Sequence, residues 1–114
     1  MLGWRAKLGL LVPSGNQVIE PELSRVVPDG VAFHCTRITN YLDTPDELAA
    51  MKDEVPAAAR LLAHAEVHAM AFACTGGSLL QGLGYDETII KAMEQATGGR
   101  IPATTTSTAV VQAM

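Results

Sequence analysis

Four short apolar segments, separated by stretches with helix signals, constrain the fold of this chain most strongly. They span residues 7–13, 31–38, 68–73 and 101–104. Each is of strand length, and the first ends at a proline while the third runs into a Thr-Gly-Gly turn. Strands that alternate with helices pair in parallel through right-handed crossovers. The sequence therefore predicts an α/β fold, an open parallel four-stranded sheet with flanking helices.

The helix signals are local capping and breaking residues. We expect helices over residues 21–27, 45–64, 87–96 and 105–114. Pro21 suits the first helical position, where its missing N–H is not needed. Thr44 is typical of an N-cap, and Pro56 predicts a kink in the second helix or its division into two. Gly98 and Gly99 should close the third helix.

Length and charge limit the classes of function. The 114 residues suit one domain, which we place over residues 1–114. Lys and Arg number 8 against 12 Asp and Glu, without a basic run, so we expect no nucleic-acid partner. No apolar stretch reaches the roughly 20 residues that cross a bilayer, so no membrane partner is expected. Two cysteines make no disulfide framework, and a reduced, cytoplasmic protein is predicted.

Three polar stretches follow predicted strands and should meet at one edge of the sheet, where open parallel sheets bind ligands. They cover residues 14–16, 74–78 and 104–108. Cys74 directly follows a strand, and the backbone N–H groups of Thr75 and Gly76 can turn toward an anion and favour a thiolate. On position alone, a small buried and unreactive thiol is an equally good interpretation.

The other polar residues have two interpretations each. Asn16 can offer an amide to a carboxylate, or it can simply hold a turn. The threonines of 104–108 can bind an anion or cap a helix, and capping is favoured. Cys35 lies inside a predicted strand and is interpreted as a packed thiol. The three histidines show no ligand spacing, so no metal site is expected.

Three motifs in order resemble those of one enzyme superfamily. Residues 9–22, GLLVPSGNQVIEPE, resemble the opening of maleate cis-trans isomerases and their arylmalonate decarboxylase relatives, within the aspartate/glutamate racemase superfamily. Residues 73–78, ACTGGS, resemble the first active-site cysteine motif, and residues 102–111 the segment that follows it. The resemblance implies a fold of two similar α/β halves with the active site between them. This chain is then expected to be the N-terminal half, with the second half absent.

The resemblance also implies a chemistry without cofactor or metal. Cys74 would be the catalytic thiolate that adds to maleate, allows rotation about the former double bond and leaves to give fumarate. Ser14, Asn16, Thr75 and Gly76 would bind the dicarboxylate substrate. Because one of two catalytic walls is expected to be missing, the chain alone should be weakly active or inactive.

Other functions remain open at this point. An amino-acid racemase would use Cys74 as one of two cysteine bases. The decarboxylases resemble this sequence but carry glycine at the position of Cys74, which disfavours that activity. A non-catalytic remnant could bind a dicarboxylate or dimerise through an exposed apolar face. We expect a homo-oligomer.

Overall fold

A parallel four-stranded sheet forms the centre of the molecule, in the order β2-β1-β3-β4. The computed structural model describes residues 5–40, 44–73 and 85–105. The strands are β1 (Ala6–Pro13), β2 (Val31–Ile38), β3 (Ala69–Phe72) and β4 (Ala103–Thr105). The helices are α1 (Ile19–Val26), α2 (Pro45–His64) and α4 (Tyr85–Ala96). The predicted fold class is confirmed.

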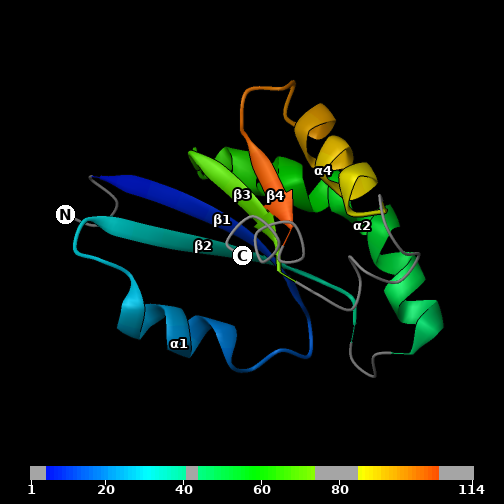
Figure 1. Cartoon of the computed structure of the whole chain (residues 1–114), viewed down its shortest axis with the longest axis horizontal. Helices are drawn as coiled ribbons and strands as arrows, with labels where there is room; N and C mark the ends of the chain where they lie inside the picture. Colours follow the sequence, from blue (N-terminus) through cyan, green and yellow to red (C-terminus); the bar gives the residue numbers. More distant parts are fainter. Residues whose placement is uncertain (1–4, 41–43, 74–84, 106–114) are drawn as a thin grey trace.

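The helices lie on opposite faces of the sheet. Figure 1 shows α1 on one side, with α2 and α4 together on the other. The chain moves from β1 outward to β2 through α1, then returns past β1 to β3 through α2. Because right-handed crossovers in opposite directions place their helices on opposite faces, this strand order requires the observed arrangement.

The hydrophobic core lies between the sheet and the helices α2 and α4. Leu11 and Phe72 are register partners on β1 and β3, and both are fully buried. They belong to one cluster with Met51 and Val55 of α2 and with Met93 of α4. Burial of such side chains contributes about 1.5–3 kcal/mol each, so this one layer supplies most of the apolar driving force.

The sheet face on the side of α1 is less completely covered. Leu8 and Leu10 alternate with the core residues of β1, and Leu8 is 38% exposed. The helix α1 buries none of its residues, and Val26 at its end is 71% exposed. The two layers are therefore unequal, with the tight one formed by α2 and α4.

Several predicted boundaries are confirmed and others shift. The strand over residues 31–38 is β2 in full. Thr44 caps α2, its side chain accepting a hydrogen bond from the Glu47 backbone N–H at 3.2 Å. After α4, Gly98 and Gly99 adopt φ values of 68° and 74°, and the Gly99 N–H reaches the Glu94 carbonyl at 2.8 Å. These positive φ angles explain why glycine closes this helix.

The predicted start of the first helix is wrong by two residues. The sequence places Pro21 at its first position, whereas α1 begins at Ile19. Pro21 still lies in the first turn, where backbone N–H groups have no partner within the helix. The proline therefore marks the first turn without fixing its first residue.

Pro56 does not divide α2, which runs without a break through 20 residues. Figure 1 shows this helix bending along its course instead. Proline removes one backbone hydrogen bond and crowds the preceding turn, so a bend is the expected response of a helix held by core contacts. Of the two predicted outcomes, the kink agrees with the structure.

The last predicted helix does not begin at Thr105. That residue ends β4 and is fully buried. The remainder of that predicted helix, residues 106–114, lies outside the described residues. In the part of the chain that the structure describes, no helix is long and apolar enough to cross a membrane.

Candidate functional site

The carboxyl ends of β1 and β3 form the point where the chain connections diverge. These strands are neighbours, and the Ala73 N–H donates to the Leu11 carbonyl at 2.9 Å just beyond the end of β3. From β1 the chain continues to α1 on one face of the sheet, and α4, the next described helix after β3, lies on the other face (Figure 1). Open parallel sheets bind ligands at such a point. The loop after β1 is its described part.

The backbone of this loop is tied to the end of β2. The Ser14 N–H donates to the Ile38 carbonyl at 2.7 Å, and the Gly15 N–H donates to the Asn40 carbonyl at 3.1 Å. In return, the Asn40 N–H donates to the Ser14 hydroxyl oxygen at 3.0 Å. Ser14 is exposed, and a hydroxyl whose oxygen accepts one bond can still donate its own proton to another acceptor.

The side chain of Asn16 holds the turn that leads into α1. Its Oδ1 accepts hydrogen bonds from the backbone N–H groups of Val18 at 3.0 Å and Ile19 at 2.9 Å. Since only the oxygen of the amide can accept, these bonds fix which end of the side chain faces the helix. Among the described residues, none accepts a hydrogen bond from its Nδ2 group. The turn interpretation is therefore correct, and it also directs two N–H donors outward.

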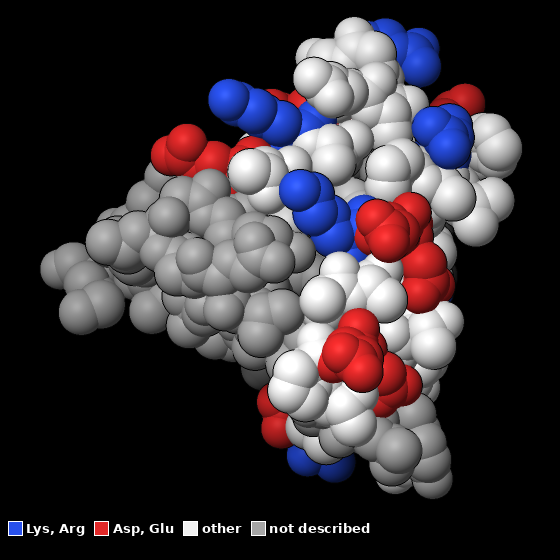
Figure 2. All heavy atoms as spheres, turned by 90° about the vertical axis from the view of Figure 1, so that its right-hand side faces the viewer, with Lys and Arg blue, Asp and Glu red and all other residues white. Residues whose placement is uncertain are grey.

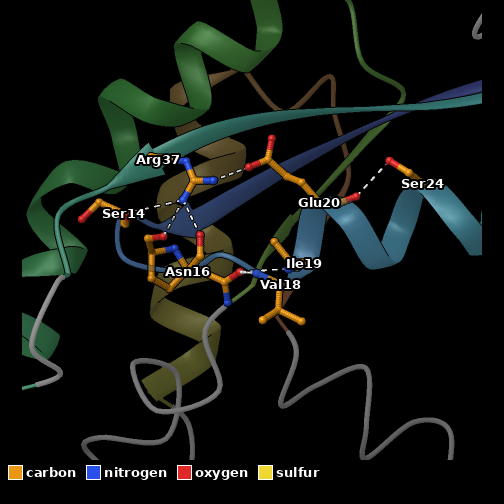
Figure 3. Close-up of polar contacts among 8 residues, drawn as sticks. Ser14, Asn16, Val18, Ile19, Glu20, Ser24 and Arg37 are labelled. Atoms are coloured by element: carbon orange, nitrogen blue, oxygen red, sulfur yellow. Dashed lines mark hydrogen bonds and ion pairs between the residues drawn. The ribbon is translucent and has the colours of Figure 1, made fainter.

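Arg37, at the end of β2, contacts the same loop. Its Nη1 donates to the carbonyls of Pro13 at 3.3 Å, Ser14 at 3.2 Å and Asn16 at 2.7 Å. Its Nη2 forms an ion pair with Glu20 of α1. Figure 3 shows the guanidinium between the loop and the first turn of this helix. Sequence reasoning missed Arg37, because only the fold brings it to a loop more than 20 residues away.

The remaining predicted site residues divide into two groups. Cys74, Thr75 and Gly76 lie outside the described residues, so their proposed roles stay predictions. Thr104 and Thr105 end β4, next to β3 on the same sheet edge. The structure thus brings Ser14 and Asn16 together, and it brings the chain to Ala73 beside β1, one residue before Cys74.

Cys35 is a different kind of thiol. It lies half-buried within β2, where burial raises its pKa above the ordinary value and Glu20 raises it further, partly offset by Arg37. A raised pKa keeps the thiol protonated near neutral pH and lowers its nucleophilicity. This environment agrees with the interpretation of Cys35 as a packed thiol.

The described charged side chains do not meet the requirements of a metal site. In the described ranges, no group of three or more His, Cys, Asp and Glu residues could hold a metal ion. On the side of the molecule that carries α2 and α4, Figure 2 shows acidic and basic side chains interspersed with uncharged ones. Of the predicted site, the part within the described residues is chiefly the loop after β1.

Comparison with known families assigns the chain. The family model described as Amdase, arylmalonate decarboxylase, matches residues 8–114. The chain belongs to this family. The match includes the whole described loop after β1, together with the Cys74 segment, and so covers both predicted parts of the site.

Maleate isomerases are among the relatives of this family member. The chain is 30% identical to the maleate isomerase of Pseudomonas putida (strain KT2440), over 95% of its own length and 47% of that enzyme. It is 26% identical to the maleate isomerase of Geobacillus stearothermophilus, over 92% of its length and 46% of that enzyme. The chain thus spans about half the length of these curated relatives. The resemblance seen in the sequence is confirmed.

Solved structures give the same relationship. A cysteine-to-alanine variant of the maleate isomerase of Pseudomonas putida S16, solved with maleate, has a TM-score of 0.83 and 26% identity. The match covers 94% of this chain and 47% of that one. A cysteine-to-serine mutant of the Nocardia farcinica maleate cis-trans isomerase, with a covalently bound succinylcysteine intermediate, also has a TM-score of 0.83, with 28% identity. That match covers 94% of this chain and 46% of the isomerase.

Proposed function

We propose that the chain forms one wall of a cofactor-independent isomerase that converts maleate to fumarate through covalent addition of Cys74. The observation that carries this proposal is the orientation of Asn16. Its oxygen is held by the first turn of α1, so its two N–H donors face outward at the end of β1. Fixed amide donors suit a carboxylate, because they need no rearrangement when the anion binds.

The relatives support a cysteine as the nucleophile. The succinylcysteine intermediate of the Nocardia farcinica enzyme is the product expected when a thiolate and a proton add across the double bond of maleate. In this chain, Cys74 directly follows Ala73, whose N–H is bonded to β1. The sequence thus offers a thiol one residue past the sheet edge at which the Asn16 donors lie.

The proposed reaction has three steps. The Cys74 thiolate attacks one carbon of the double bond, and the electron pair of that bond moves to the adjacent carbon, where the neighbouring carboxylate spreads the charge. The former double bond is now single and rotates. The electron pair then returns, the carbon–sulfur bond breaks, and fumarate leaves with the thiolate restored. The second half of a complete enzyme would give a proton to the adjacent carbon and take it back.

The binding residues stabilise the negative charge that develops during this reaction. The Nδ2 group of Asn16 and the hydroxyl of Ser14 donate to a substrate carboxylate, together with the backbone N–H groups of Thr75 and Gly76. Removal of one such donor from a charge-stabilising site lowers rates by about a hundredfold or more. Because the chain spans about half the length of its relatives, we expect weak or no turnover from it alone.

Covalent labelling tests the proposal without requiring turnover. The chain is incubated with maleate, and its intact mass is followed for a gain of one maleic acid. Cys35→Ser, which removes the other thiol, should label like the unchanged chain, whereas Cys74→Ser should not. Glutathione at equal concentration gives the rate for an unassisted thiol. Label that persists in Cys74→Ser, or no label in Cys35→Ser, contradicts the proposed nucleophile.

Asn16→Asp separates binding from folding. The aspartate keeps an oxygen for the N–H groups of Val18 and Ile19, but it replaces the outward donors with a second oxygen that repels a carboxylate. We expect labelling by maleate about a hundredfold slower, with the hydrogen exchange of the Val18 and Ile19 amides unchanged. Labelling at the original rate would remove Asn16 from the site.

Decarboxylation of an arylmalonate is the second candidate, because the family model carries that description. The two reactions share a developing negative charge next to a carboxylate, so the same donors would serve either. The decarboxylases, however, resemble this chain with glycine in place of Cys74. Conversion of phenylmalonate to phenylacetate, followed by NMR and unaffected by Cys74→Ser, would favour decarboxylation over isomerisation.

A further inference from the structure

The guanidinium of Arg37 contacts the backbone of the loop that presents Asn16. We infer that Arg37, oriented by Glu20, is a positioning residue that fixes the loop of residues 13–16 so that the Asn16 amide faces a substrate carboxylate. This inference rests on the proposed function for its ligand, a small dicarboxylate. The holding of the loop itself rests on contacts within the described residues.

Most backbone N–H and C=O groups of residues 13–16 have a hydrogen-bond partner. The N–H groups of Ser14 and Gly15 go to the end of β2, and the Asn16 N–H goes to the Pro13 carbonyl at 3.0 Å. The carbonyls of Pro13, Ser14 and Asn16 all converge on Arg37 Nη1. Carbonyl dipoles that point at one another repel, so a cation at their meeting point stabilises this loop shape.

The contact to Asn16 links Arg37 to the ligand donors. The backbone oxygen of Asn16 accepts from Arg37 at 2.7 Å, while its side-chain oxygen accepts from the N–H groups of Val18 and Ile19. Both oxygens of the residue are thereby engaged, and the Nδ2 group alone remains directed outward. Figure 3 shows the amide on the opposite side of the loop from the guanidinium. Loss of the Arg37 contact would free the backbone that carries this amide.

Glu20 sets the direction of the guanidinium. It receives Nη2, while Nη1 faces the three carbonyls, and this division uses the planar fork of arginine. Lysine, with one nitrogen on a flexible stem, cannot reach both sets of acceptors in this way. The two side chains are each 41% exposed, and an ion pair at that exposure contributes little stability alone. The importance of the Arg37–Glu20 pair therefore lies in the contacts of Arg37 with the three loop carbonyls.

Arg37 is not the ligand of the carboxylate in this arrangement. Its charge is met by Glu20, and its donors point toward the loop and α1 rather than out of the sheet edge. A substrate carboxylate would have to displace these partners to reach it. Positioning through Asn16 is the interpretation that keeps every observed contact.

NMR of the ¹⁵N-labelled chain tests the inference. Three variants are compared with the unchanged chain, namely Arg37→Ala, Arg37→Lys and Arg60→Ala. Arg60 is an exposed arginine of α2, so its removal changes the net charge equally without touching the loop. Maleate is titrated while the Asn16 side-chain amide is observed, and hydrogen exchange of the Val18 and Ile19 amides is measured without ligand. Circular dichroism melting checks that each variant is folded.

We expect Arg37→Ala to weaken maleate binding by about tenfold, or about 1.4 kcal/mol, and to speed exchange at Val18 and Ile19. Arg37→Lys should stay clearly weakened despite its charge, and it also serves if the alanine variant does not fold. Arg60→Ala should match the unchanged chain. Arg37 variants that bind and exchange like Arg60→Ala overturn the inference. So does full binding by Arg37→Lys, which would make charge alone sufficient.

The result also separates the inference from the proposed function. If the unchanged chain shows no response of the Asn16 amide to maleate, the proposed substrate fails. Hydrogen exchange then decides the role of Arg37 by itself. Faster exchange in both Arg37 variants than in Arg60→Ala supports its hold on the loop, and equal exchange refutes it.

Discussion

The chain has two cysteines, and the structure describes the environment of Cys35. Cys35 lies within β2, half-buried, with a pKa raised by burial and by Glu20. Cys74 follows the end of β3 in the sequence and lies outside the described residues; its activation by the backbone N–H groups of Thr75 and Gly76 is part of the proposed function. The two thiols are therefore predicted to react at different rates. Cys35 also provides an internal reference for every labelling experiment on this chain.

The raised pKa of Cys35 predicts slow alkylation. In the Cys74→Ser variant, Cys35 is the remaining thiol, and its reaction with iodoacetamide at pH 7 should be slower than that of glutathione. Because deprotonation requires a higher pH, the rate should still be rising above pH 9, the ordinary value for this thiol. Rates are read by intact mass. A plateau below pH 9 would contradict the environment seen in the structure.

At the scale of single residues, what the sequence could reveal depended on distance along the chain. Asn16 was recognised because its partners are two and three residues away. Arg37 was not, because its acceptors at Pro13, Ser14 and Asn16 become neighbours only when β1 and β2 pair. A basic residue at the end of an edge strand gives no local signal of such a contact.

The helix α2 is one of the main contributors to the described core. It contributes Met51, Val55 and Leu62 to the buried cluster, and it begins at a single hydroxyl cap. Its start at Thr44 followed directly from sequence, since a capping residue before a proline is a local signal. The start of α1 was misplaced because its N-cap, Val18, has no side chain that could cap a helix, and the side chain of Asn16 acts from two residues further upstream.

Removal of the α2 cap should weaken the whole domain. Thr44→Ala leaves the Glu47 N–H without the acceptor it has at 3.2 Å, and the free energy of unfolding should fall by about 1 kcal/mol. Urea denaturation followed by circular dichroism measures the change. Thr44→Ser keeps the hydroxyl and should stay near the unchanged value. An equal loss in both variants would show that the cap is not the cause.

At the scale of the whole molecule, stability is unevenly distributed. One layer contains Leu11, Phe72 and Met93 at full burial, whereas α1 on the other side buries no residue. The four strands and their parallel pairing were predictable, because apolar segments and crossover rules act on all of them together. Their order, β2-β1-β3-β4, came from the structure. The incomplete cover on the side of α1 was not predictable, because exposure of a face depends on every element that packs there.

This imbalance predicts two rates of hydrogen exchange. Amides of α1 should exchange faster than those of α2, because local opening of α1 exposes little apolar surface. Its polar ties include the hydrogen bond from the Ile19 N–H to Asn16 and the Glu20–Arg37 ion pair. Mass spectrometry of exchanged peptides compares the two helices in one sample. Protection of α1 equal to that of α2 would contradict the unequal layers.

The divergence of the chain connections at the carboxyl ends of β1 and β3 has a consequence for how this fold can change. The chain leaves β1 toward α1 on one face of the sheet, and α4, the next described helix after β3, lies on the other face (Figure 1). Substitutions in the few loop residues beyond these strands therefore leave the packed layer untouched. Related proteins could therefore differ in the reaction they catalyse through changes in these few loop residues, while the sheet and its packed core stay the same.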